Sequence, residues 1–260
     1  RQSVYGVIAG AAVAQMVGDS TVYDITNRMP ITVEARINNA YVGGVVGLGE
    51  GTVANSFNYP ALNVSGTEVH GGGIVGKAER AGLTVRQAAN YGDIAVSDTA
   101  GGHAGGIVGS AAGFLRMRED DTPIANTGAV TATGGRSAYA GGIVGRADGE
   151  LTLSPRTASN GTVTVNAPDA AGAYAGGIVG AMTSQQTEQQ FDLTYTNTVA
   201  VTNTGGAGVY AGGFAGFAGG AVVWGGNYAN EAELLVKGAD SVYTGGFIGY
   251  AAGNLQADGT

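Results

Sequence analysis

A seven-residue motif recurs along almost the whole chain and restricts it to a repeat architecture. Its pattern is aromatic-x-Gly-Gly-φ-φ-Gly, where φ is an apolar residue. The first glycines of the pairs are residues 43, 72, 105, 141, 176, 212 and 245, so successive copies lie 29, 33, 36, 35, 36 and 33 residues apart. Self-similarity with a period of roughly 20–50 residues is typical of solenoids, propellers and arrays.

A second anchor, usually an asparagine, lies inside each repeat. It begins an Asn-x-x-x-φ-x-φ segment, and the matching residues are Asn27, Asn58, Asn90, Asn126 and Asn230. Two repeats deviate: Asn160 comes one residue late, and Tyr195 takes the slot before Val199. A third short apolar run, such as Leu83-Thr84-Val85, separates the two motifs. Runs of period two bounded by Gly, Asn, Asp or Ser indicate strands, and no stretch sustains the 3.6-residue period of a helix.

We therefore predict an all-β chain folded as a β-solenoid (β-helix), with about three short strands in each coil of about 34 residues. Seven to eight coils would stack at about 4.8 Å per coil. The whole chain, 1–260, would form one repeat domain: a partial coil at 1–40, repeats beginning near residues 41, 70, 103, 139, 174, 210 and 243, and an incomplete last repeat. A seven- or eight-bladed propeller is the alternative, although its blades usually need about 40–50 residues.

The first apolar stretch, Val4–Val17, has two interpretations. Gly6–Gly10 fits as a degenerate copy of the motif, with Gly6 placed 37 residues before the first full copy. The stretch also follows Arg1 and has the character of a signal peptide. It is shorter than the about 20 apolar residues that a membrane helix needs, and no other segment comes closer to that length. We therefore expect no membrane span in this segment.

Stacked coils would bring equivalent side chains above one another. The aromatic slot predicts a stack of rings along one edge, formed by Tyr41, His70, His103, Tyr139, Tyr174, Tyr210 and Tyr243. The asparagine slot predicts a ladder of amides that caps a turn, formed by Asn58, Asn90, Asn126 and Asn230. The Gly-Gly pair marks a position without room for a Cβ atom, at either a left-handed turn or a close backbone approach.

Both φ positions of the motif are apolar in every repeat, whereas adjacent strand residues normally face opposite sides. One set would then point out of the coil as a continuous stripe: Val46, Val75, Val108, Val144, Val179 and Ile248. A stripe of this length exceeds the apolar patches that monomers usually expose. Either loops and neighbouring runs cover it, or it is an interface for another chain or domain.

The motifs carry a resemblance to a known family. Gly-Gly-Ile-Val-Gly followed by an Asn-x-Gly-x-φ run, as in Asn126-Thr127-Gly128-Ala129-Val130, resembles the GLUG-motif repeats of bacterial cell-surface proteins. Such repeats occur in adhesin-like proteins and beside the catalytic module of immunoglobulin A1 metallopeptidases. The resemblance covers nearly the whole chain and implies an extracellular repeat region, although the period here is longer and the Tyr or His before the glycines is an added feature.

Catalytic and metal-binding groups are scarce in the sequence. The chain has no cysteine and two histidines, His70 and His103, which are 33 residues apart and occupy the aromatic slot. A zincin helix needs two histidines four residues apart, so the pattern favours ladder members over ligands, and we predict no metal and no cofactor. Glu50 and Glu79 follow the motif in neighbouring coils and could approach the about 5–5.5 Å of a retaining glycosidase pair. Later coils do not keep acids there, which favours a solvated turn.

Charge and loops point to few partners. The net charge of −8 argues against a nucleic-acid partner, because phosphate binding needs basic patches. The cluster Arg116–Asp121 indicates a mixed-charge surface loop, with calcium or a charged partner as the alternative. The polar segment Thr183–Gln190 is typical of a protruding loop and is a weak contact candidate.

These features together predict a non-catalytic structural or adhesive rod from a bacterial surface or secreted protein, located outside the cell or on its surface. Its partners would be neighbouring domains or identical subunits, with a host or matrix glycan or protein as a further candidate. A subunit of an extracellular filament or sheath, assembled through the apolar stripe and open strand edges, is the alternative. A polysaccharide-active β-helix enzyme is the third candidate.

Overall fold

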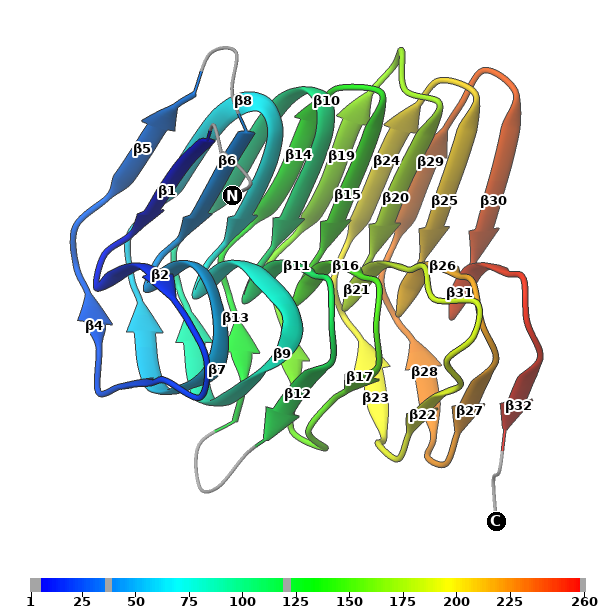
Figure 1. Cartoon of the computed structure of the whole chain (residues 1–260). Coiled ribbons are helices and arrows are strands. Elements are labelled where there is room, and N and C mark those ends of the chain that lie inside the picture. Colours follow the sequence, from blue (N-terminus) through cyan, green and yellow to red (C-terminus); the bar gives the residue numbers. More distant parts are fainter. Residues whose placement is uncertain (1–5, 36–38, 119–122, 258–260) are drawn as a thin grey trace.

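The computed structural model describes residues 6–35, 39–118 and 123–257. These residues form an all-β solenoid of about seven turns with roughly 33 residues per turn, and the turns stack in parallel from the N-terminal to the C-terminal end (Figure 1). Described residues contain no helix. The predicted β-solenoid is therefore confirmed, and the parallel pairing between successive coils excludes the propeller alternative.

Each coil contributes strands to five rows that run along the solenoid. Four long strands near the N-terminal end pass through several rows without a break: β8 (Leu62–Gly72) and β10 (Ile94–Gly105) span rows one and two, and β7 (Val46–Asn58) and β9 (Val75–Asn90) span rows three to five. In later coils the same path is divided into short strands.

The short strands are assigned to rows by their pairing. Row one contains β5 (Ile31–Glu34), β14 (Val130–Gly134), β19 (Val163–Ala167), β24 (Val201–Gly205) and β29 (Leu234–Lys237). Row two contains β1 (Gly6–Gly10), β6 (Asn39–Gly43), β15 (Ser137–Gly141), β20 (Gly172–Gly176), β25 (Gly208–Gly212) and β30 (Ser241–Gly245). Row three contains β2 (Val13–Met16), β11 (Val108–Ala111), β16 (Val144–Ala147), β21 (Val179–Met182), β26 (Ala215–Ala218) and β31 (Ile248–Ala251).

The remaining two rows close the coil. Row four contains β3 (Thr21–Tyr23), β12 (Leu115–Arg118) and β17 (Leu151–Thr152), and it continues as a separate three-stranded sheet of β22 (Gln189–Phe191), β27 (Val222–Trp224) and β32 (Leu255–Ala257). Row five contains β4 (Thr26–Asn27), β13 (Ala125–Asn126) and β18 (Ala158–Ser159), and it continues as a separate two-stranded sheet of β23 (Tyr195–Asn197) and β28 (Tyr228–Asn230). A coil thus has five strand segments where the sequence indicated about three, because the glycine motif and the asparagine motif each divide between two rows.

The first apolar stretch belongs to the solenoid. Strand β1 pairs in parallel with β6, and Gly10 lies opposite Gly43 while Ile8 lies opposite Tyr41. The degenerate copy of the motif is therefore real, but it aligns through Gly10, 33 residues before Gly43, and not through Gly6. Residues 1–5 lie outside the described part of the chain.

The solenoid has two hydrophobic cores separated by close backbone contacts. Rows one and two enclose a smaller core of residues such as Leu62, Ile94 and Val130, and rows three to five enclose a larger one. The last glycine of the motif lies between them: a Cβ atom on Gly145 would be 2.8 Å from the carbonyl oxygen of Ala104 in row two of the preceding coil. This glycine therefore allows the second and third rows to touch through their backbones.

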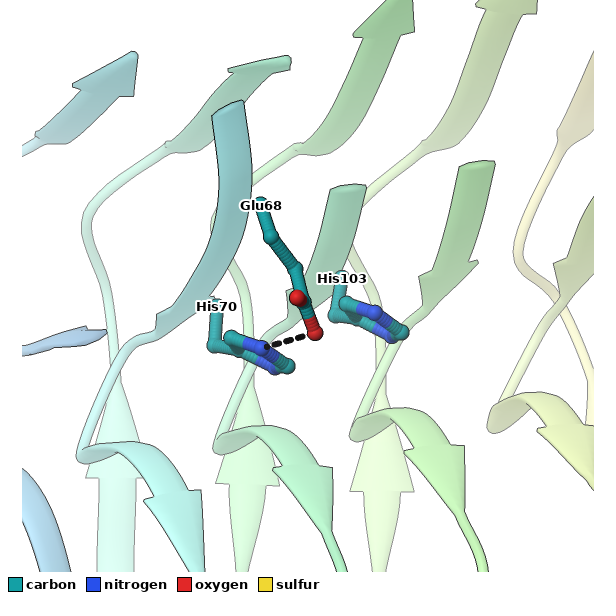
Figure 2. Close-up of side chains that lie close together, drawn as sticks. All are labelled: Glu68, His70 and His103. Carbon is teal, nitrogen blue, oxygen red and sulfur yellow. Dashed lines mark hydrogen bonds and ion pairs between the residues drawn. The ribbon is translucent and has the colours of Figure 1, made fainter. Parts of the chain in front are cut away.

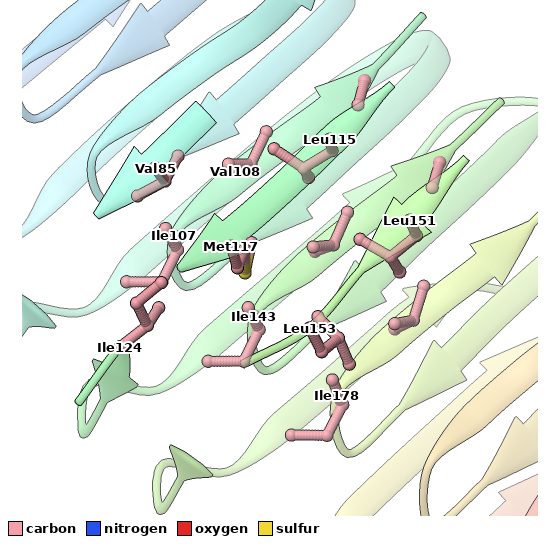
Figure 3. Packing of buried hydrophobic residues seen from close by; sticks show 14 of the residues in the cluster. Val85, Ile107, Val108, Leu115, Met117, Ile124, Ile143, Leu151, Leu153 and Ile178 are labelled. Atoms are coloured by element: carbon pink, nitrogen blue, oxygen red, sulfur yellow. The ribbon is translucent and has the colours of Figure 1, made fainter. Parts of the chain in front are cut away.

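The predicted outward-facing apolar stripe is wrong. Val46, Val75, Val108, Val144 and Val179 are buried, and Ile248 packs partly buried against the same core as the preceding φ residues. Figure 3 shows Ile107 and Val108 both in this core. The chain bends at the second motif glycine and first φ residue, which interrupts the alternation of a strand. Accordingly, the N–H groups of Val45 and Val46 both donate to the carbonyl oxygen of Ile74, at 3.0 and 2.9 Å.

Candidate functional site

Seven aromatic side chains form one continuous stack on the second row. From Tyr41 to Tyr243 the centroids of successive rings lie 4.4 to 5.1 Å apart, and all pairs after the first are within 8° of parallel. The members are those in the aromatic slot of the motif: Tyr41, His70, His103, Tyr139, Tyr174, Tyr210 and Tyr243. We call this set the ring stack. Parallel strands about 4.8 Å apart impose this spacing on identical side chains.

Side chains of the third row cover the ring stack. Nζ of Lys77 lies 4.9 Å from the centroid of the Tyr41 ring, and Cζ of Arg146 lies 5.3 Å from that of Tyr139. Farther along, Phe217 meets the stack edge-on, 5.9 Å from Tyr174. A cation over an aromatic face contributes about 0.5–1 kcal/mol at exposed sites, so the covering residues stabilise the stack as well as shield it.

Glu68, His70 and His103 are the one group of three or more potential metal ligands found in the described part of the chain. One ligand atom from each of the three lies within 4.8 Å of the others (Figure 2). Nε2 of His70 is 3.2 Å from Oε1 of Glu68, and its Nδ1 is 2.7 Å from Oγ of Ser110. Because a carboxylate can only accept, Nε2 of His70 carries the proton and Nδ1 accepts from the Ser110 hydroxyl.

Burial sets the charge of this cluster. Both imidazoles are 4 % exposed or less, and desolvation lowers the pKa of His70 and lowers that of His103 further, with the His70 ring as a second cause. The hydrogen bond from His70 lowers the pKa of Glu68. At neutral pH the cluster is therefore two neutral imidazoles beside a carboxylate. Nδ1 of His103 is buried and has no hydrogen-bond partner among the described residues.

A buried carboxyl group lies near this cluster in sequence, on β10. Asp98 is 6 % exposed, and neither carboxyl oxygen has a hydrogen-bond partner in the described residues. Gly102 and Gly135 border the group, and a Cβ atom on either would collide with a carboxyl oxygen of Asp98. Burial raises the pKa of Asp98 to about 7. The repeat pattern does not single out this residue, because the coils on either side have glycine at that position.

Asp98 should make the stability of the chain depend on pH. A carboxyl whose pKa rises from 3.8 to about 7 on folding binds its proton more tightly in the folded state, so stability falls as pH rises through that window. At about 1.4 kcal/mol per pKa unit the loss amounts to at most about 4 kcal/mol. Asp98→Asn should remove this part of the pH dependence, measured as the difference between urea midpoints at pH 5 and pH 8. The exposed Asp169→Asn is the control, and equal pH dependence in all three proteins would contradict the assignment.

Asparagine amides form a second ladder, on the fifth row. Nδ2 donates to Oδ1 of the next coil at 2.8 Å from Asn27 to Asn58, at 2.7 Å from Asn58 to Asn90 and at 2.7 Å from Asn90 to Asn126. The other N–H group donates within the coil, as from Asn126 to the carbonyl oxygen of Gly128 at 2.8 Å. Ser159 interrupts the ladder, and it resumes between Asn197 and Asn230 at 2.7 Å. We call Asn27, Asn58, Asn90, Asn126, Asn197 and Asn230 the asparagine ladder.

Two assignments from the sequence are corrected by this register. Asn160 is exposed and Ser159 occupies the slot, and Asn197 rather than Tyr195 is the ladder member of its coil. Tyr195 pairs instead with Tyr228. The signal for Asn197 was the apolar Val201 four residues later, but Asn203 replaces the second apolar residue of the pattern and concealed the match.

The Gly-Gly pair is explained by the ladder that it contacts. A Cβ atom on Gly106 would lie 2.6 Å from Nδ2 of Asn126 in the same coil and even closer to the carbonyl oxygen of Gly142 in the next. Gly44 stands in the same relation to Asn58, at 2.6 Å from its Cγ. Neither glycine has the positive φ of a left-handed turn. The close backbone approach is therefore the correct alternative of the two predicted.

The remaining sequence candidates lie in rows three and four and in the turn between them. The pairing of β7 with β9 shifts between Gly49 and Gly51, so Glu50 and Glu79 are not register partners, and Oε1 of Glu50 instead accepts from the N–H of Gly18 at 2.6 Å. Arg116–Arg118 lie in β12, whereas residues 119–121 of that charge cluster lie outside the described residues. In the segment Thr183–Gln190, Gln189 is buried in β22 and its Oε1 accepts from the N–H of Leu151 at 2.8 Å, so the end of that segment is not a protruding loop.

The parallel rows define the chain as a β-solenoid repeat protein. Comparison with family models, with curated proteins and with solved structures found no match to it. In residues 6–35, 39–118 and 123–257 no helix has the length and apolar character needed to cross a membrane.

Proposed function

We propose that this chain is a non-catalytic extracellular rod, structural or adhesive, of a bacterial surface or secreted protein. The observation that carries the proposal is the unbroken parallel pairing of rows one to three, in the second row from β1 to β30, along which the ring stack runs. The asparagine ladder runs beside it on the fifth row, with one interruption at Ser159. Seven steps of about 4.8 Å give a rod about 34 Å long. The extracellular location and the bacterial source rest on the resemblance to GLUG-motif repeats.

The rod would act mechanically and spatially, by holding neighbouring domains apart or by presenting loops to a host or matrix glycan or protein. In rows one to three each internal coil is paired on both sides, and every asparagine side chain of the ladder makes hydrogen bonds. In such quasi-one-dimensional proteins stability accumulates from contacts between neighbouring repeats. A local opening therefore has to break two interfaces, which favours a stiff and protease-resistant element.

Antibodies raised against the chain test the proposed location. They should label intact cells of the producing bacterium or protein in its culture medium. Labelling that appears only after lysis would contradict an extracellular rod. Turnover of a polysaccharide that Glu50→Gln or Glu79→Gln abolishes would contradict a non-catalytic role and favour the enzyme candidate.

A filament or sheath subunit is the second candidate, supported by strand edges rather than by the buried apolar stripe. β30 and β31 are paired on one side only within the described residues, and the last coil exposes apolar side chains such as Leu235 and Val242. Asn230 retains one N–H group beyond its bond to the carbonyl oxygen of Ala232, whereas Asn27 receives no side-chain bond from a preceding coil within the described residues. A second copy stacked head to tail would match these groups. Polymer visible by electron microscopy favours this candidate, and a monomer at all concentrations in sedimentation removes it.

A further inference from the structure

Three departures from the repeat pattern coincide at one place in the solenoid. Five full repeats have tyrosine in the aromatic slot, but two consecutive coils have histidine, and these are the only histidines of the chain. Glu68 lies two residues before His70. Among the residues that share its register position along the second row, which we call a file, it is the only acid. The other members of that file are Gly6, Asn39, Gly101, Ser137, Gly172, Gly208 and Ser241. Stacking alone does not require these changes, because tyrosine fills the slot on both sides of the pair.

The geometry places the three side chains around one small volume. The carboxylate of Glu68 points between the two imidazoles, which are stacked 4.4 Å apart (Figure 2). Gly101 of the next coil keeps the space beside them open: a Cβ atom there would be 3.8 Å from Nε2 of His103 and 3.9 Å from Cγ of Glu68. Glu68 is 45 % exposed, so a solute reaches this volume from the outer surface.

The second histidine is less favourable than tyrosine at its place in the stack. His70 is held by Glu68 and Ser110, and Nε2 of His103 faces Gly101, but Nδ1 of His103 is buried and has no hydrogen-bond partner among the described residues. An unpaired buried polar atom costs about 1–3 kcal/mol and calls for an explanation. Tyrosine at this slot would avoid that cost, since the neighbouring coils accommodate it. The stacking of rings therefore does not explain why histidine occupies this position.

We propose that Glu68, His70 and His103 bind one divalent transition-metal ion that prefers nitrogen ligands, of which Zn²⁺ is the probe. Two imidazoles and one carboxylate are a ligand set that Zn²⁺ uses, with water in the fourth position. Zn²⁺ binds nitrogen in the plane of the imidazole at about 2.0–2.1 Å. Because the two rings are 3° from parallel, both must turn until their Nε2 lone pairs converge on the ion, while Glu68 rotates towards it. The ion would link two consecutive coils by binding Nε2 of both histidines, and the ring proton of His70 would then sit on Nδ1 and be donated to the hydroxyl oxygen of Ser110.

Titration calorimetry with ZnCl₂ on the intact, chelator-treated chain tests the site. One ion per chain should bind. His70→Tyr and His103→Tyr should each weaken binding at least about tenfold, since one of three ligands is lost. Tyrosine is the substitution of choice because Tyr41 and Tyr139 already fill the slot in the flanking coils, so the ring stack and the melting temperature without zinc should persist. Glu68→Gln should weaken binding similarly, whereas Glu79→Gln should not.

A second measurement on the unmodified chain removes dependence on the folding of the variants. Co²⁺ in place of Zn²⁺ should give the visible absorption of a four-coordinate site with nitrogen and oxygen ligands. Since the chain has no cysteine and only two histidines, imidazole ligation can come from this site alone. Absence of both saturable Zn²⁺ binding and the Co²⁺ bands would overturn the proposal, as would binding that His103→Tyr leaves unchanged.

Discussion

Replacing Gly106 with alanine should destabilise the chain by about 3 kcal/mol or more, which is at the upper end of the cost of overpacking. The added methyl group would lie 2.6 Å from Nδ2 of Asn126 and closer still to the carbonyl oxygen of Gly142. Both neighbours are held in ladders, one by the amide bonds of the fifth row and the other by backbone pairing. Relief of the collision therefore requires two coils to move apart, which would also break the pairing of the flanking strands.

The same motif position in the last coil provides a matched control. Around Gly246 a Cβ atom would meet only Cβ of Asn230, at 3.8 Å, which is an ordinary contact. Gly246→Ala should therefore change the free energy of unfolding by less than about 0.5 kcal/mol, as most surface substitutions do. Urea unfolding of the two variants beside the parent measures the difference. Equal destabilisation would show that the glycine pair serves backbone conformation and not the approach of the coils.

Asn126→Leu should cost about 3 kcal/mol although leucine is similar in size. The change removes the acceptor for Nδ2 of Asn90 and the donor to the carbonyl oxygen of Gly128, and both groups are buried. Each buried group left without a partner costs about 1–3 kcal/mol. Ser159 shows that one coil tolerates a smaller polar residue in this slot, so Asn126→Ser should cost less than Asn126→Leu.

The control for the ladder is the asparagine one residue outside it. Asn160 is exposed, and Asn160→Leu should leave the urea midpoint within experimental error of the parent. If Asn126→Leu and Asn160→Leu had the same effect, the amides of the fifth row would contribute no more than a solvated side chain. That result would contradict the role assigned to the asparagine ladder.

The period of the motif was sufficient to predict the solenoid and the ring stack. Once the glycine pairs repeat every 29 to 36 residues, parallel stacking of coils places Tyr139 beside Tyr174, and their ring centroids are 4.6 Å apart. Insertions between the motifs change the period without changing the register, because they lie in turns between rows. The prediction therefore depends on the motif itself and not on a constant repeat length.

Features that depend on bends and on exceptions to the repeat could not be predicted in the same way. Strand alternation through the glycine pair predicts Val108 outside the coil, whereas the chain bends there and Val108 lies in the core. Asn197 was missed because Asn203 breaks the apolar pattern that follows it. Asp98 and Glu68 each occur once in their files, so no periodicity identifies them, and only the packing of neighbouring coils shows what surrounds them.

Distances between spin labels along one row test the stacking of coils most directly. Four residues share one register position on row one: Thr32, Thr164, Thr202 and Leu235. Counted along the paired strands, Thr164, Thr202 and Leu235 lie four, five and six coils from Thr32. The chain has no cysteine, so single cysteines at these positions take labels without side reactions. Measured by pulsed electron paramagnetic resonance, the three distances from residue 32 should be about 19, 24 and 29 Å, rising by about 4.8 Å per coil. Distances that do not increase in step with the number of intervening coils would contradict the solenoid.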